Sequence, residues 1–128
     1  MIRSCTYDQN EILSSIMQIC GIERFGADIT YGNGSFYKKI PEPTLKFDID
    51  PQVDGVTEAS SVDLPVESSS LHSLVFDPPF MTYVRAGRSG NGNMIMAKRF
   101  GGYWRYDELE AHYRATLEES ARVLSKKG

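Results

Sequence analysis

The sequence has few cysteines and no long apolar run, and each shortage excludes a class of protein. Its 128 residues contain two cysteines, too few for a disulfide framework or for a zinc site built from cysteine alone. No segment approaches the roughly 18 apolar residues that span a membrane, and the N-terminus lacks the apolar core of a signal peptide. We therefore expect a protein of the reducing cytoplasm, with no membrane partner and no metal.

An excess of positive charge is also absent. Fourteen basic and 17 acidic residues give a net charge of −3, which excludes a globally basic nucleic-acid-binding protein. The length fits one domain, and 41% hydrophobic with 24% charged residues is ordinary for a globular fold. One segment departs from this balance, because residues 79–105 contain five basic residues and no acid.

Apolar periodicity predicts helices near both ends of the chain. Residues 8–20 have helical spacing, with Asp8 suited to the start and Gly21 to the end. Six apolar residues are expected on its buried face: Ile12, Leu13, Ile16, Met17, Ile19 and Cys20. A second apolar stripe predicts a core-facing helix near the C-terminus: Tyr106, Leu109, Tyr113, Leu117, Ala121 and Leu124.

Short apolar segments between these helices predict strands. They are residues 25–28, 45–49, 55–59 and 71–76, with a short helix over 35–40. This alternation favours an α/β layered sheet. Only about six residues separate the second strand from the third, whereas a parallel crossover uses roughly a dozen. We therefore expect the third strand to be missing, displaced, or joined to the second without a helix.

Acidic residues end the first two predicted strands. The first strand leads into Asp28-Ile29-Thr30-Tyr31-Gly32-Asn33-Gly34, where two glycines let the backbone pass close to a ligand. A plain glycine turn is the alternative. About twenty residues later Asp48 ends the second strand, where nucleotide-binding folds place an acid on the ribose hydroxyls. The alternative for Asp48 is a turn cap before Pro51.

The fourth predicted strand ends in Asp77-Pro78-Pro79-Phe80. The carboxyl ends of strands are where α/β sheets bind ligands. Two prolines fix the backbone and remove two donors, so a carboxylate and carbonyl oxygens remain as acceptors. Such acceptors suit an amino group, and Phe80 suits stacking on a flat base. The alternative is a Pro-Pro turn with Phe80 in the core.

In this order and spacing, the three segments resemble the S-adenosylmethionine-dependent methyltransferases of nucleic-acid amino groups. The resemblance is closest to DNA methyltransferases of adenine N6 or cytosine N4. It implies a Rossmann-like class I methyltransferase sheet with S-adenosylmethionine as cofactor. The cofactor-binding residues that it implies are Asp28, Thr30, Tyr31, Gly32, Asn33, Gly34 and Asp48. The residues that it implies for the target amine and the flipped base are Asp77, Pro78, Pro79 and Phe80.

On this resemblance the chain stops where the family's fifth strand begins. Residues 1–128 are therefore expected to form a single, partial methyltransferase domain, truncated before that strand. An isolated half-sheet leaves an unpaired edge at its fourth strand. We accordingly expect self-association, or a second polypeptide that completes the sheet.

The basic segment favours a nucleic acid as the partner, with DNA implied by the resemblance and RNA as the alternative. Residues 81–104 are rich in glycine and aromatic residues, and we expect a mobile loop beside the Asp77 motif. Basic and aromatic side chains there suit phosphate contacts and base stacking. The candidate nucleic-acid-binding residues are Arg85, Arg88, Lys98 and Arg99. A solvated loop without this role is the alternative.

Two other functions stay open on the sequence. An RNA methyltransferase, such as one acting on guanosine N2, can use the same Asp-Pro-Pro motif. A non-catalytic chain that binds nucleic acid or completes a partner is the second alternative. The sequence places no other candidate metal ligand at a suitable spacing from His72 or His112, so we interpret both as structural or exposed.

Overall fold

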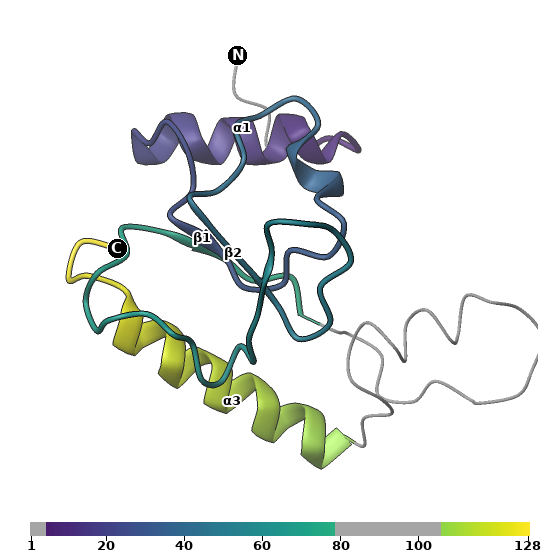
Figure 1. Cartoon of the computed structure of the whole chain (residues 1–128). Coiled ribbons are helices and arrows are strands. Elements are labelled where there is room, and N and C mark those ends of the chain that lie inside the picture. Colours follow the sequence, from purple (N-terminus) through teal and green to yellow (C-terminus); the bar gives the residue numbers. More distant parts are fainter. Residues whose placement is uncertain (1–4, 79–105) are drawn as a thin grey trace, which may run out of the picture.

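The computed structural model describes residues 5–78 and 106–128, and these residues form the α/β architecture that the sequence predicts. Figure 1 shows a central sheet with one long helix on each face. Helix α1 (Gln9–Cys20) covers one face, and helix α3 (Tyr106–Val123) covers the other. The short 3-10 helix η1 (Ser35–Tyr37) packs beside α1.

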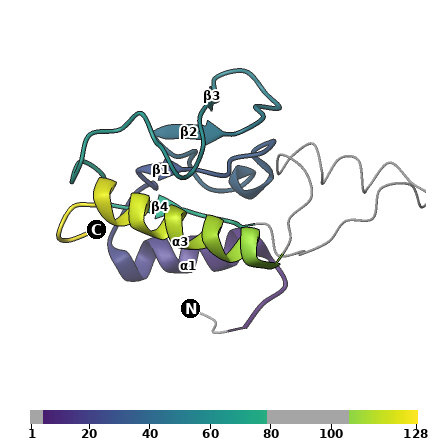
Figure 2. The same cartoon turned by 90° about the horizontal axis from the view of Figure 1, so that it is seen from below.

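Four described strands form one parallel sheet in the order β3-β2-β1-β4 (Figure 2). The strands are β1 (Ala27–Asp28), β2 (Leu45–Asp48), β3 (Thr57–Glu58) and β4 (Leu74–Val75). Each lies inside its predicted segment and is shorter than it. In the register, Asp28 is opposite Lys46 of β2 and Val75 of β4. The ends of β1, β2 and β4 therefore lie next to one another.

The third strand is present, and it is joined to the second without a helix. Residues 49–56 run as an irregular connection, with Gly55 in the left-handed region at φ 83. The register explains why so short a connection suffices. Thr57 pairs with Phe47 of the preceding strand, so the chain travels back only about two residues, or roughly 7 Å, before pairing resumes.

The predicted boundaries of the first helix are confirmed, but its predicted buried face is only partly correct. Asp8 accepts a hydrogen bond from the N–H of Asn10 at 2.9 Å, and Gly21 ends the helix at φ 65. Leu13 and Met17 pack in the core. The other apolar residues of that face are exposed: Ile12, Ile16, Ile19 and Cys20. The helix contacts the sheet along a line narrower than its apolar face.

The predicted core-facing stripe of α3 is also partly wrong. Leu109 of the stripe is buried, but Leu117 is 62% exposed and Ala121 is exposed too, whereas Val123, which is not in the stripe, is buried. Between the two buried residues, the core positions carry hydroxyl side chains. Thr116 lies 2.9 Å from the hydroxyl of Ser61, and Ser120 donates to the carbonyl of Thr116 at 2.7 Å. An apolar stripe misses such positions, because small hydroxyls are buried once they are hydrogen-bonded.

A charged pair fastens the loop before β4 to α3. Arg122 and Glu119 form an ion pair, and the Arg122 guanidinium donates to the carbonyls of Leu64 and Val66. Glu119 in turn accepts from the N–H of Leu64 at 2.8 Å. These bonds hold α3 against the sheet face on which it packs.

The sheet divides the described core into two clusters. On the α3 side the buried residues are Ala27, Ile29, Phe47, Leu64, Leu71 and Val123. On the α1 side they are Met17, Phe25, Tyr31 and Tyr37. Since side chains alternate along a strand, Asp28 points away from the α3 side and reaches Tyr37. No helix within residues 5–78 and 106–128 is long and apolar enough to cross a membrane.

Candidate functional site

Three acidic residues on separate strands meet at one edge of the sheet. Asp28 ends β1, Asp48 ends β2, and Asp77 follows β4 by two residues. The chain builds outward from β1 to β2 and β3, and then returns to place β4 on the other side of β1. Open α/β sheets bind ligands at such a switch point, outside the carboxyl ends of their strands. This edge is the candidate site.

Asp28 is a buried carboxylate without a cation beside it. It is 1% exposed; its Oδ1 accepts from the Thr30 N–H at 2.8 Å, and its Oδ2 accepts from the Tyr37 hydroxyl at 2.5 Å. Among the described residues no Lys, Arg or His pairs with it. Burial raises the pKa of Asp28 to about 6, against hydrogen bonds from Tyr37 and Thr30 that lower it. Such perturbed carboxylates concentrate at functional sites.

The Gly-x-Gly segment forms a turn that Asp48 holds from the neighbouring strand. Gly32 and Gly34 are both left-handed, at φ 61 and 75. Asp48 Oδ2 accepts from the Gly32 N–H at 2.7 Å, and its Oδ1 accepts from the Asp50 N–H at 3.0 Å. Asp48 is 4% exposed. The two segments assigned to the cofactor are therefore in direct contact, and the acid on β2 shapes the glycine turn.

Tyr31 and Asn33 of the same segment point in different directions. The Tyr31 ring is buried and stacks on Tyr37 with centroids 5.5 Å apart, and its hydroxyl donates to Glu42 at 2.8 Å. Asn33 is exposed, and its side chain accepts from the N–H of Ser35 at the start of η1. Tyr31 thus packs against Tyr37 inside the core, and Asn33 is exposed next to Gly34, the N-cap of the short helix.

The space around Gly34 shows how tightly this turn is packed. A methyl group added there would lie 2.5 Å from the Tyr31 hydroxyl oxygen, whereas one added at Gly21 meets nothing within 4 Å. Both glycines have positive φ, so both substitutions carry backbone strain. We expect Gly34→Ala to lower the free energy of unfolding by about 2–4 kcal/mol, against about 1 kcal/mol for Gly21→Ala. Urea denaturation measures both, and equal losses would contradict a tightly packed turn.

Asp77 is tied to β1 through a side chain. Its backbone N–H donates to Thr30 Oγ1 at 2.8 Å, and that oxygen lies 3.4 Å from Asp28 Oδ1. The Asp77 side chain is exposed, and Pro78 after it is half-buried. The motif therefore starts at the switch point, with its carboxylate open to solvent.

Sequence reasoning missed two tyrosines at this site. Tyr37 hydrogen-bonds to Asp28, and Tyr113 packs edge-on against Phe76 with centroids 6.2 Å apart. Burial, together with the charge of Asp77, raises the pKa of Tyr113, which places its phenol near the motif. The apolar stripe of the C-terminal helix includes Tyr113 only as a core residue, and no pattern indicates Tyr37, because each reaches the site through the packing of a helix on the sheet.

The rest of the predicted site lies outside the described residues. It comprises the end of the Asp77 motif and the basic segment expected over 81–104. The residues concerned are Pro79, Phe80, Arg85, Arg88, Lys98 and Arg99.

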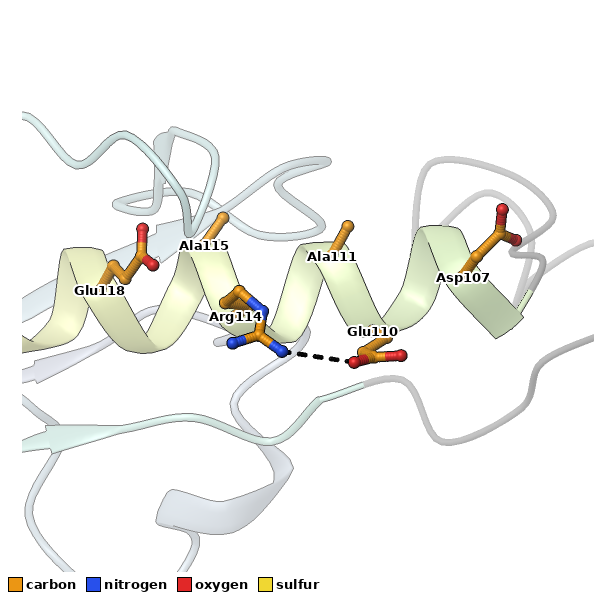
Figure 3. Close-up of a pocket in the computed structure, with 6 residues that line it drawn as sticks. All are labelled: Asp107, Glu110, Ala111, Arg114, Ala115 and Glu118. Carbon is orange, nitrogen blue, oxygen red and sulfur yellow. Dashed lines mark hydrogen bonds and ion pairs between the residues drawn. The ribbon is translucent and has the colours of Figure 1, made fainter.

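Other surface features of the described residues do not include the three strand-end acids. Figure 3 shows a shallow depression of about 290 Å³ along the outer face of α3, lined by Asp107, Glu110, Ala111, Arg114, Ala115 and Glu118. His72 is exposed, and His112 is half-buried with Nε2 3.4 Å from the Ser61 hydroxyl. No three His, Cys, Asp or Glu side chains in the described part of the chain are grouped to hold a metal ion.

Comparison of the chain with protein-family models, curated proteins and solved structures yields no match. The function proposed below therefore depends on the residues and their geometry.

Proposed function

We propose that this chain is a Rossmann-like class I methyltransferase that transfers a methyl group from S-adenosylmethionine to an exocyclic amino group of a DNA base, adenine N6 or cytosine N4. The observation that carries the proposal is the meeting of Asp28, Asp48 and Asp77 at the switch point of the sheet. The methyltransferase resemblance requires these three segments, far apart in the chain, to share one site. Their positions on three adjacent strands support that requirement.

The acceptors at this edge fit the polar groups of the cofactor. Carboxylates accept hydrogen bonds from ammonium and hydroxyl groups, which the cofactor carries on its methionine and ribose parts. Asp28 has no cation among the described residues, and a ligand ammonium would supply one. Asp48 already accepts from Gly32, and each carboxylate oxygen keeps a second lone pair for a ribose hydroxyl. Because both acids are almost fully buried, the residues that cover them have to shift as a ligand enters.

The acceptors after β4 suit the second substrate. The bound cofactor supplies an activated methyl group, so the protein has mainly to align the target amine and stabilise its change of charge. The Asp77 carboxylate accepts a hydrogen bond from one N–H of that amine, and the Pro78 carbonyl accepts a hydrogen bond from the other. These bonds shift the nitrogen towards tetrahedral geometry and make its lone pair available. The target base has to leave the DNA double helix first, which costs free energy. Stacking of the base on Phe80 offsets about 1–3 kcal/mol of that cost.

Transfer of a labelled methyl group to DNA or RNA tests the proposal. Purified chain is incubated with the methyl-labelled cofactor and either a mixed-sequence DNA duplex or an RNA of the same sequence. We expect label on adenine or cytosine of the DNA. Label confined to guanosine of the RNA would favour the second candidate, an RNA amino-methyltransferase, since the Asp77–Pro78 acceptors fit any exocyclic amine. A folded chain that labels neither substrate contradicts both.

A further inference from the structure

We infer that Thr30 is a positioning residue that couples the buried carboxylate of Asp28 to the reactive motif at Asp77. The inference rests on the proposed function and deepens it, because it links the cofactor side of the site to the amine side.

The bonds around Thr30 form a short chain between the two acids. The N–H of Thr30 donates to Asp28 Oδ1 at 2.8 Å, and Thr30 Oγ1 lies 3.4 Å from the same oxygen. The same Oγ1 accepts from the Asp77 N–H at 2.8 Å. A hydroxyl has one proton and two lone pairs, so the proton faces Asp28 while a lone pair faces Asp77. One side chain thus serves both acids.

The bond to Asp77 replaces a backbone bond of the sheet. The pairing of β1 with β4 continues to Ile29, whose N–H donates to the carbonyl of Val75 at 3.0 Å. In a regular parallel ladder, the Asp77 N–H would next donate to a backbone carbonyl at the end of β1. It donates instead to the Thr30 side chain, so the position of Asp77 depends on which residue stands at position 30.

The direction of the Thr30 hydroxyl depends on the charge of Asp28. An ionised Asp28 attracts the hydroxyl proton, which leaves a lone pair free for the Asp77 N–H. A ligand ammonium at Asp28 favours that ionised form. Cofactor binding and the placement of Asp77 therefore support each other across the switch point, over a sequence separation of 47 residues.

Two matched variants test this role in the full chain. Thr30→Val keeps the shape of the side chain but has no hydroxyl, whereas Thr30→Ser keeps the hydroxyl. We expect Thr30→Val to speed hydrogen exchange of the Asp77 amide by about tenfold, and Thr30→Ser to keep it near wild type. In methyl transfer, Thr30→Val lowers kcat by about tenfold and also weakens the binding of S-adenosylhomocysteine, because the coupling acts in both directions, and Thr30→Ser restores both.

The outcomes separate this inference from the proposed function. Hydrogen exchange of the Asp77 amide needs neither cofactor nor DNA, so an amide unaffected by Thr30→Val overturns the positioning role alone. Equal losses of kcat in Thr30→Val and Thr30→Ser also overturn it, because the hydroxyl then has no special part. A folded wild-type chain that does not bind S-adenosylhomocysteine overturns the proposed function, and the coupling with it, whatever the amide does.

Discussion

Replacing Asp77 with alanine is expected to lower methyl transfer by about 10²–10³-fold, because the target amine loses the charged acceptor that stabilises its transition state. The fold should be unaffected. The Asp77 side chain is exposed, and the bond to Thr30 uses its backbone N–H, which alanine retains. We expect the free energy of unfolding to change by less than about 0.5 kcal/mol. The assay is single-turnover transfer of a labelled methyl group to DNA.

Two further variants make this result specific. Asp77→Asn keeps an acceptor oxygen without the charge, so we expect its rate to fall between those of wild type and Asp77→Ala. Asp54→Ala removes an exposed acid in the connection between β2 and β3 that is not one of the three strand-end acids, and should leave the rate unchanged. Full activity in Asp77→Ala would contradict the proposal that Asp77 binds the target amine.

The second large effect concerns stability and pH. The pKa of Asp28 is about 6 in the folded chain, because burial disfavours its charged form, against an ordinary value of 3.8. The folded state therefore holds the proton more tightly than the unfolded state. The contribution of Asp28 to the free energy of unfolding falls as pH rises from about 4 to about 6, by about 3 kcal/mol in all, and then levels off.

Asp28→Asn isolates this contribution. Asparagine does not titrate, so the difference in free energy of unfolding between wild type and variant should change by about 3 kcal/mol over that pH range. As the pH rises, wild type should lose this amount of stability relative to the variant. The difference is the useful quantity, because Asp8, Glu42 and Glu119 have pKa values lowered by hydrogen bonds and act in the opposite direction. Urea titrations at several pH values measure it. A constant difference would contradict a raised pKa of Asp28.

Tyr37→Phe is a control that should change the pKa of Asp28 in a known direction. The variant removes the hydroxyl that donates to Asp28 but keeps the ring stacked on Tyr31. Because that hydrogen bond lowers the pKa of Asp28, its loss should raise the pKa further. The fall in stability with rising pH should then be larger in total and extend to higher pH than in wild type.

Much of the fold follows from local sequence patterns. Short apolar segments locate β1, β2 and β4, the third strand is present as one of the alternatives left open, and the Asp8 and Gly21 caps locate the ends of α1. The faces of the helices do not follow, since Leu117 is an exposed leucine of the predicted stripe whereas Thr116 beside it is buried. Burial there depends on whether Ser61 completes the hydrogen bonds of Thr116, a contact between distant segments.

The candidate site, like the fold, could be predicted only in part from the sequence. Strand-end acids followed by glycine or proline indicate where a ligand binds, so Asp28, Asp48 and Asp77 could be chosen from the sequence. Their internal partners could not. The Tyr37 hydroxyl reaches Asp28 only after η1 has folded over the turn, and Thr30 reaches Asp77 only because β4 pairs with β1. The sequence also gives no sign that the carboxylates of Asp28 and Asp48 are buried whereas that of Asp77 is exposed.

Calorimetric titration of the chain with S-adenosylhomocysteine, beside Asp28→Asn, tests the central claim most directly. The proposed site predicts micromolar binding by wild type near neutral pH. It predicts binding at least about tenfold weaker in Asp28→Asn, and urea denaturation of that variant at the same pH separates lost affinity from lost folding. A folded wild-type chain that releases no heat, or an Asp28→Asn variant that binds as tightly as wild type, would contradict a cofactor site at the end of β1.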